Sequence, residues 1–193
     1  MTIDEMKQKL QKILSLKRYT HSVNVMETAV QLAQRYDADV EKCAIAGLLH
    51  DCARDIRGDK LFDLCAHYNI EVDEIERRQP ELLHGPLGVY IAIREYGVTD
   101  DQVLEAIKWH TTGTPGMDTI SKIIFISDFI EPLRNFTGVE ALRKEAFEDL
   151  DQAVVMGIDS TLRYILTRKG LLHPDTVNTR NWLLMNSKAG EQQ

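Results

Sequence analysis

The sequence predicts an all-α fold, and three observations support this prediction. Apolar residues recur at spacings of three and four along most of the chain, which is the pattern of helices that bury one face. We find no two-residue alternation of β-branched residues, so no strand is expected. Glycine and proline divide the periodic stretches into separate helices of ordinary length.

The first half of the chain contains several of these helices. A buried stripe follows Thr20 and consists of Val23, Met26, Val30 and Ala33. The apolar run 44–49 ends at His50-Asp51 and predicts a core helix whose small residues allow close packing. The sequence Arg57-Gly58-Asp59 separates one helix from the next, and Gln79-Pro80 marks another break.

The second half continues in the same way. Gly85-Pro86 predicts a helix start, and Gly97 predicts the C-cap of that helix. Residues 111–115 form an expected loop, and an apolar helix follows before Pro132. The longest stripe ends at Gly170, and its members are Leu150, Val154, Gly157, Ile158, Thr161, Leu162 and Ile165. His173-Pro174 leads into the last expected helix.

Composition excludes several classes of protein. The formal net charge of −7 disfavours binding to a nucleic acid polymer, which depends on clustered lysine and arginine. The 3 cysteines form no C-x-x-C pair, which argues against a disulfide framework or a structural zinc site and fits the cytoplasm. No apolar run approaches the roughly 18 residues that span a bilayer, so no membrane association is expected.

Two acidic residues stand in apolar surroundings. Asp128 lies within the apolar run 123–130, and Asp51 follows His50 at the end of the apolar run 44–49. A buried carboxylate is costly unless it is paired or bound to a metal. Imidazole and carboxylate ligands from separate helices suit zinc, iron or manganese. A metal would also have a chemical use, because it lowers the pKa of bound water to about 7 and polarises a phosphoryl oxygen.

Each of these residues also has an ordinary explanation. A single His-Asp pair often arises by chance, and Asp128 could equally cap a helix or face solvent. His67 lies in an amphipathic stretch and His173 in a proline turn, so neither is expected to bind metal. The ordered set of residues carries more weight than any one member.

That ordered set resembles a known family. His21, then His50-Asp51, then Asp128 is similar to the H…HD…D metal signature of the HD-domain superfamily. The neighbouring motifs resemble those of the YqeK-type HD-domain family of symmetrical bis(5′-nucleosyl)-tetraphosphatases, and the resemblance spans nearly the whole chain. These motifs are Arg18-Tyr19-Thr20-His21-Ser22, Leu83-His84-Gly85-Pro86, Trp109-His110-Thr111-Thr112-Gly113 and Ser127-Asp128-Phe129-Ile130-Glu131-Pro132.

The resemblance implies a single all-α HD-type domain over 1–193, with its core at about 18–135 and C-terminal helices 137–187 packing on it. It implies a metal held by His21, His50, Asp51 and Asp128. Iron is the expected metal, as one or two ions, with manganese or zinc as alternatives. Asp51, His84 and His110 are the expected catalytic residues, and the two histidines either hold a second metal or contact phosphate.

The implied reaction is symmetrical hydrolysis of diadenosine tetraphosphate to ADP. The alternatives are an HD-type phosphohydrolase of another nucleotide and a non-catalytic nucleotide sensor, and a homodimer is left open. Beside His84 and His110, the expected substrate contacts are Arg18, Arg54, Arg57 and Arg134 for phosphate, and Leu172, His173, Thr176 and Asn181 for the base or ribose.

Overall fold

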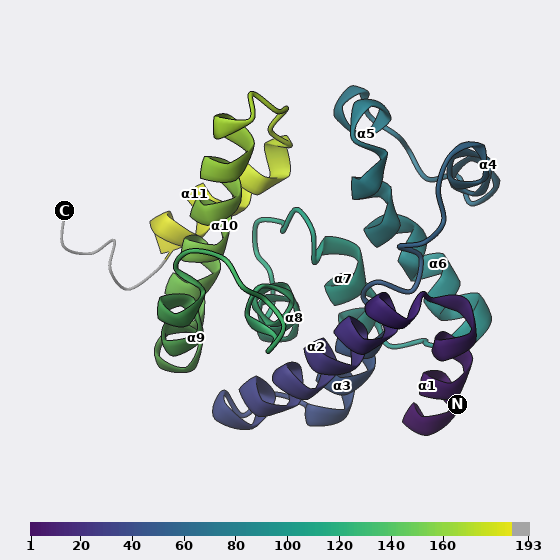
Figure 1. Cartoon of the computed structure of the whole chain (residues 1–193), viewed down its shortest axis with the longest axis horizontal. Helices are drawn as coiled ribbons and strands as arrows, with labels where there is room; N and C mark the ends of the chain where they lie inside the picture. Colours follow the sequence, from purple (N-terminus) through teal and green to yellow (C-terminus); the bar gives the residue numbers. More distant parts are fainter. Residues whose placement is uncertain (187–193) are drawn as a thin grey trace.

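The computed structural model describes residues 1–186, and every regular element in this range is helical. The absence of strands from these residues confirms the expected all-α fold (Figure 1). In chain order the elements are α1 (Ile3–Ile13), α2 (Leu16–Arg35), α3 (Val40–Leu49), α4 (Asp59–His67), α5 (Glu74–Arg78), the 3-10 helix η1 (Pro80–Leu83), α6 (His84–Tyr96), α7 (Asp101–Trp109), α8 (Thr119–Ile130), α9 (Val139–Glu148), α10 (Leu150–Thr167) and α11 (Pro174–Asn186).

Helix α8 lies at the centre of the molecule. It packs against α2, α3 and α7 on one side and against α9 and α10 on the other. Its residues Ile123, Ile124 and Ile126 are fully buried. Each such side chain contributes roughly 1.5–3 kcal/mol through removal of apolar surface from water. The apolar character of α8 therefore reflects a helix that is covered nearly all round.

Two glycines let pairs of helices approach closely. A Cβ atom on Gly47 of α3 would lie 2.9 Å from the Cα atom of Met26 on α2. A Cβ atom on Gly85 of α6 would lie 2.5 Å from the carbonyl oxygen of Lys108 on α7. The close α2–α3 contact brings His21 and His50 together, and the close α6–α7 contact does the same for His84 and His110. This confirms the expected role of the small residues before His50.

Most expected helix boundaries are correct to within a few residues. Gly97 caps α6 in the left-handed conformation with a φ of 69°, as expected. Helix α3 ends at Leu49, so that His50 and Asp51 occupy the turn that follows it. Helix α10 ends at Thr167 rather than at Gly170, because the chain turns at Lys169 with a φ of 55°. The Gly170 amide then donates to the Ile165 carbonyl at 2.9 Å and closes this turn.

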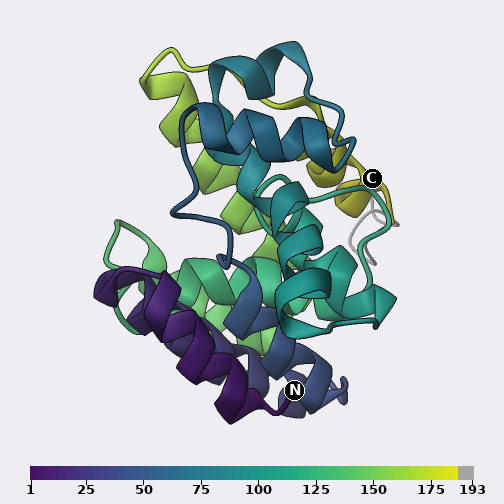
Figure 2. The same ribbon diagram turned by 90° about the vertical axis from the view of Figure 1, so that its right-hand side faces the viewer.

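The last three helices lie on the far side of α8 from α1 and the α4–α6 region (Figures 1 and 2). One cluster of buried apolar side chains extends from Met6 on α1 to Leu183 on α11. A smaller cluster lies between α4 and α6 and includes Leu61 and Leu87. The division into a core at about 18–135 and helices at 137–187 stays a prediction, and residue 187 lies outside the described residues.

All 3 cysteines, Cys43, Cys52 and Cys65, are buried free thiols. Burial raises the pKa of the Cys43 thiol to about 12, so this thiol stays protonated at neutral pH. Among the helices that the structure describes, none has the length and apolar character required to cross a membrane.

Candidate metal centre

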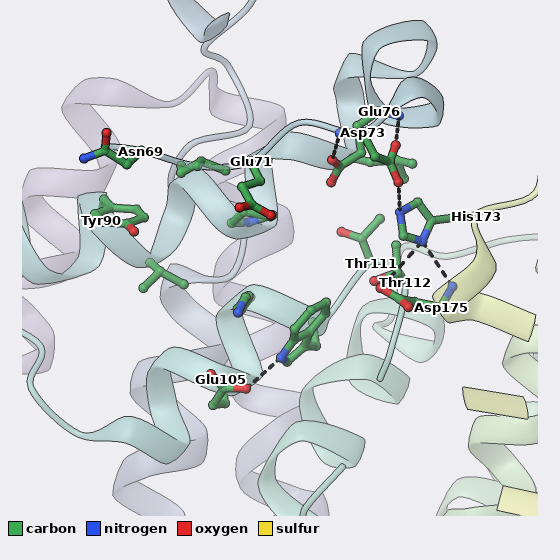
Figure 3. A pocket seen from close by; sticks show the side chains of 16 residues that line it. Asn69, Glu71, Asp73, Glu76, Tyr90, Glu105, Thr111, Thr112, His173 and Asp175 are labelled. Atoms are coloured by element: carbon green, nitrogen blue, oxygen red, sulfur yellow. Dashed lines mark hydrogen bonds and ion pairs between the residues drawn. The ribbon is translucent and has the colours of Figure 1, made fainter. Parts of the chain in front are cut away.

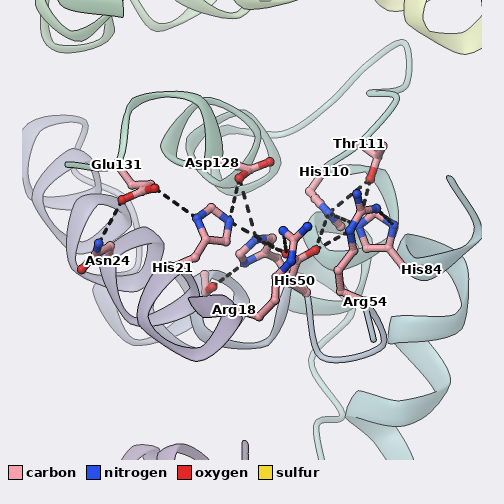
Figure 4. Close-up of polar contacts among 12 residues, drawn as sticks. Arg18, His21, Asn24, His50, Arg54, His84, His110, Thr111, Asp128 and Glu131 are labelled. Carbon is pink, nitrogen blue, oxygen red and sulfur yellow. Dashed lines mark hydrogen bonds and ion pairs between the residues drawn. The ribbon is translucent and has the colours of Figure 1, made fainter. Parts of the chain in front are cut away.

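The predicted metal ligands converge from different helices onto one buried centre (Figure 4). His21 lies in the second turn of α2, His50 and Asp51 directly follow α3, and Asp128 is on α8. The four residues therefore come from three helices or helix ends, as predicted. His84 begins α6 and His110 follows α7, and both reach the same centre.

Asp51 lies between two groups of histidines. Its Oδ2 atom is 3.9 Å from His21 Nε2 and 3.8 Å from His50 Nε2. Its Oδ1 atom is 3.1 Å from His84 Nε2 and 3.8 Å from His110 Nε2. The carboxylate thus contributes one oxygen to each of two groups whose ligand atoms all lie within 4.8 Å of one another.

Asp128 completes the first of these groups. Its Oδ1 atom lies 2.9 Å from His21 Nε2 and 4.0 Å from His50 Nε2. The second group has no further carboxylate among the described residues, and its two histidine Nε2 atoms lie 2.9 Å apart.

The other ring nitrogen of each histidine fixes its orientation. Nδ1 of His50 lies 2.7 Å from the Gly47 carbonyl oxygen, and Nδ1 of His110 lies 2.7 Å from that of Ile107. Nδ1 of His84 likewise contacts the carbonyl oxygen of Glu81. A carbonyl accepts only, so in His50 and His110 Nδ1 carries the proton and Nε2 keeps its lone pair toward the centre.

These residues fit a divalent transition metal. The buried Nε2 atoms of His21 and His50 have no hydrogen-bond partner, although carboxylate oxygens lie within 4 Å of both. Lone pairs and carboxylate oxygens repel one another across such a space unless a cation lies between them. Ligand distances of roughly 2.0–2.2 Å place adjacent ligand atoms about 3–4 Å apart, which agrees with the separations seen here.

Burial and the local charges hold His50, His110 and Asp128 in the protonation states that a metal requires. Burial lowers the pKa of His110 to about 3, and the neighbouring His84 and His50 act in the same direction. Burial also lowers the pKa of His50. Burial opposes ionisation of Asp128, but the close contact with His21 and the charge of Arg134 outweigh it and hold the pKa of Asp128 well below its usual range.

Asp51 and His21 respond to the same surroundings. Burial alone would raise the pKa of Asp51, but the nearby His50, His84 and His110 lower it well below the ordinary value. Burial alone would lower the pKa of His21, but the adjacent carboxylate of Asp128 outweighs burial and raises it. Both carboxylates are therefore ionised at neutral pH.

Three of the four arginines predicted to bind phosphate touch this centre. Arg18 Nη1 lies 3.1 Å from Asp51 Oδ2, and Arg134 pairs with the carboxylate of Asp128. Arg54 Nη1 donates to the Glu81 carbonyl at 3.0 Å and lies 2.9 Å from His84 Nδ1. Arg57 is exposed and lines a cavity of about 400 Å³ together with Arg54 and His84.

A larger cavity of about 600 Å³ opens onto the other side of the centre. Asp128, Arg54 and Arg134 contribute its polar wall, and Thr111 borders it as well. Its aromatic lining is Phe129, Phe136 and Tyr164. Cavities of this size accept small-molecule ligands, and this one combines cationic with apolar walls, as a nucleotide requires.

The C-terminal residues predicted to contact base or ribose lie farther along the molecule. His173 lines a third cavity of about 520 Å³, beside Trp109 and Thr112, and its Nε2 lies 3.4 Å from Asp73 Oδ2 (Figure 3). Thr176 is buried and Asn181 is exposed, and neither lines the cavities described above. The predicted contacts of Leu172, His173, Thr176 and Asn181 with substrate stay predictions.

The structure also adds residues that sequence reasoning did not select. Glu131 is 2% exposed, and its Oε1 lies 3.2 Å from His21 Nδ1. Thr111 Oγ1 lies 3.2 Å from His110 Nε2 and 3.4 Å from His84 Nε2. Both residues stand beside predicted ligands in the sequence, but adjacency alone does not show which of a ligand's neighbours face the centre.

Comparisons with known proteins agree with this arrangement. The HD domain family matches residues 18–133. A protein of Bacillus subtilis named symmetrical bis(5′-nucleosyl)-tetraphosphatase is 40% identical over 170 residues, which cover 88% of this chain and 91% of that protein. A protein of Staphylococcus aureus with the same name is 37% identical over 185 residues, which cover 94% of each chain.

A solved structure is also similar. It is the crystal structure of a protein from Clostridium acetobutylicum that is described as a predicted HD superfamily hydrolase involved in NAD metabolism. The two chains share 43% sequence identity and superpose with a TM-score of 0.94, over 97% of this chain and 99% of that one. The fold, the order of the histidine and aspartate residues along the chain and these relatives agree. The chain belongs to the HD domain family and, within it, to the group of the symmetrical bis(5′-nucleosyl)-tetraphosphatases.

Proposed function

We propose that this protein hydrolyses diadenosine tetraphosphate and related dinucleoside polyphosphates at the central phosphoanhydride. Water attacks one of the two central phosphorus atoms, so that one ADP takes the oxygen of water, the other leaves with the bridging oxygen, and the protons of water are released. The observation that carries the proposal is the buried Asp51, which joins two histidine groups beneath arginine-lined cavities. The names of the relatives specify the symmetrical reaction.

The residues of the centre form two groups with different proposed roles. His21, His50, Asp51 and Asp128 would hold one divalent metal, and Asp51, His84 and His110 would hold a second metal or contact the phosphates directly. Iron is the metal that we propose, with manganese or zinc as alternatives. When bound, the metal supplies Lewis-acid polarisation of a phosphoryl oxygen and a lowered pKa of bound water.

The arginines supply the charge that a polyphosphate chain needs. Arg54 borders both the 400 Å³ and the 600 Å³ cavities, so one guanidinium can face phosphates that cross between them. Arg134 and Arg18 already pair with Asp128 and Asp51, and each has further donors that can turn toward substrate. We propose that these three residues and Arg57 position the substrate so that its central phosphates lie at the centre.

Two other functions remain distinguishable by experiment. A phosphohydrolase of mononucleotides would use the same centre, because the ligands act on phosphate and not on the base. A non-catalytic nucleotide sensor would be expected to lose ligands, and this chain keeps the whole expected set. We further propose that the chain acts as a single domain in the cytoplasm, in keeping with its free cysteines.

Chromatography of an early time point tests the proposed cut. The purified protein is incubated with diadenosine tetraphosphate, with and without added metal, and the products are separated. ADP as the sole product, formed only with metal, is the expected result. Equal amounts of AMP and ATP would show attack at an outer phosphate and would overturn the symmetrical assignment. No product with any of the three metals would overturn the proposed substrate and favour one of the two other functions.

A further inference from the structure

Three of the four histidines at the centre are oriented by the backbone. His50 caps the C-terminus of α3, His84 that of η1 and His110 that of α7. The last carbonyl groups of a helix have no intrahelical partner, so they are free to accept from a side chain. Each ring uses the carbonyl three residues earlier for this purpose.

His21 cannot use this device. It lies in the interior of α2, where each carbonyl already accepts a hydrogen bond from an amide of the same helix. Its Nδ1 therefore requires a partner from elsewhere in the fold. Glu131, the residue that ends α8, supplies that partner at 3.2 Å.

Both carboxylate oxygens of Glu131 are engaged. Oε1 faces His21 Nδ1, whereas Oε2 accepts from Asn24 Nδ2 at 3.0 Å and from the Leu133 amide at 2.8 Å. The backbone beneath this side chain is also held, because Arg143 donates to the carbonyls of Ile130 at 2.9 Å and Glu131 at 3.0 Å. The carboxylate therefore has one defined orientation toward His21.

We propose that Glu131 is a positioning residue that keeps the proton of His21 on Nδ1 and thereby keeps the Nε2 lone pair directed at the metal. This inference deepens the proposed function and rests on its metal site, but it does not depend on the substrate. Partners that orient a ligating histidine in this way typically change metal affinity by 10–100-fold when they are removed.

The substitution Glu131→Gln tests the role with little change of volume. If the amide oxygen keeps facing His21, the amide nitrogen must face the Leu133 amide, which is also a donor. If the amide turns over, its nitrogen donates to Nδ1 and moves the proton to Nε2, where it blocks the metal. Either orientation weakens the first site: the first sets two donors against each other at Leu133, and the second places the proton of His21 on Nε2.

The experiment measures the Kd for Co²⁺ by competition with a chelating dye, without substrate. We expect Glu131→Gln to raise the Kd by roughly tenfold or more. The same substitution in a His21→Ala background should have little further effect, because the residue acts through His21. His50, Asp51 and Asp128 remain in that background, so a weaker Kd stays measurable.

Two further variants guard against a merely structural explanation. Glu140→Gln makes the same chemical change on a residue that also contacts Arg143 but lies away from His21, and it should leave the Kd within about twofold. Asn24→Ala removes one of the two donors to Oε2 of Glu131 and should weaken Co²⁺ binding in the same direction, again through His21.

An unchanged Kd in Glu131→Gln overturns the inference. A full additional loss in the His21→Ala background overturns it as well, because it assigns the effect to packing. If Glu131→Gln does not fold, Asn24→Ala decides by the same two criteria. Failure of the parent protein to bind Co²⁺ would instead overturn the metal site of the proposed function.

Discussion

The two sides of Asp51 differ in charge and in how their ligands are held. On the carboxylate side, formed by α2, α8 and the end of α3, His21 and His50 face Asp128 as well as Asp51. On the histidine side, formed by α6 and α7, His84 and His110 share only Asp51. A cation gains more from two carboxylates than from one, so we infer that the carboxylate side binds metal more tightly.

The histidines of the two sides are held in different ways, so their orientations should respond differently to small shifts between helices. His84 and His110 are fixed by carbonyls next to them in the chain, so their orientation survives small shifts between helices. His21 depends on Glu131, which is 110 residues away in the sequence, so its orientation requires α2 and α8 to be correctly packed. The tighter side is thus also the side that depends more on the tertiary fold.

The largest effect is expected at the residue that both sides share. Asp51→Ala removes a carboxylate oxygen from each group, so it should abolish bound metal and lower turnover by roughly a thousandfold or more. Elemental analysis and hydrolysis assays on the same samples provide the measurement. His67→Ala is the matched control, because His67 is exposed, and it should change neither quantity. Full metal content with normal turnover in Asp51→Ala would contradict the shared role.

A smaller effect is expected when only the histidine side is damaged. His84→Ala and His110→Ala should each lower turnover by about a hundredfold while the carboxylate side keeps its metal and the fold is retained. Circular dichroism, metal content and turnover would be compared with those of the parent. If both variants are as active as the parent, the histidine side takes no part in the reaction and serves only packing.

The sequence predicted the helices and the buried cluster of His21, His50, Asp51 and Asp128 for a definite physical reason. Burial of a carboxylate such as Asp128 in an apolar helix is costly unless the carboxylate is paired or binds a metal. A lone aspartate within an apolar run is therefore a sign of such a site that can be recognised in the sequence. The small residue Gly47 predicted the close packing that brings His50 to His21. Local periodicity and the family motifs were sufficient for these features.

Other features depend on contacts that no local pattern encodes. Glu131 looks like any acidic residue before a proline, and only the packing of α8 against α2 places it beside His21 and Asn24. The three cavities likewise arise between elements that are distant in the chain. Their walls are assembled by the fold, so the predicted base contacts of His173 and Asn181 could be drawn only from resemblance.

Selective removal of metal should separate the two sides. If both sides bind an ion, the ion on the histidine side should leave first, with a Kd at least about tenfold higher than that of the carboxylate side. Stepwise addition of a chelator, followed by metal analysis of the protein, would then show two phases. His110→Ala should remove the first phase only. A single phase carrying two ions per chain would contradict the inferred difference in affinity.

The smallest expected effect is on the pH dependence of stability in the metal-free protein. The two sides shift the pKa values of their histidines in opposite directions. The pKa of His21 is raised because Asp128 outweighs its burial, whereas burial and neighbouring histidines lower the pKa of His110 to about 3.

The sign of each contribution to stability follows from the unfolded value near 6.5. His21 binds its proton more tightly when folded, so it stabilises the fold below pH 6.5 and loses this effect as pH rises through its folded pKa. His110 binds its proton more weakly when folded, so it destabilises the fold as pH falls from about 6.5 toward 3.

Urea unfolding of the chelator-treated protein at pH 7.0 and 5.5 tests the His110 contribution. Between these two pH values the free energy of unfolding should fall by about 1 kcal/mol less in His110→Asn than in the parent. The reason is that the variant lacks the ring that takes up a proton on unfolding. NMR titration should also find His21 protonated at a pH where His110 is still neutral. Equal titration of the two rings would mean that the charge of Asp128 does not distinguish them, and the contrast between the two sides would then rest on ligand geometry alone.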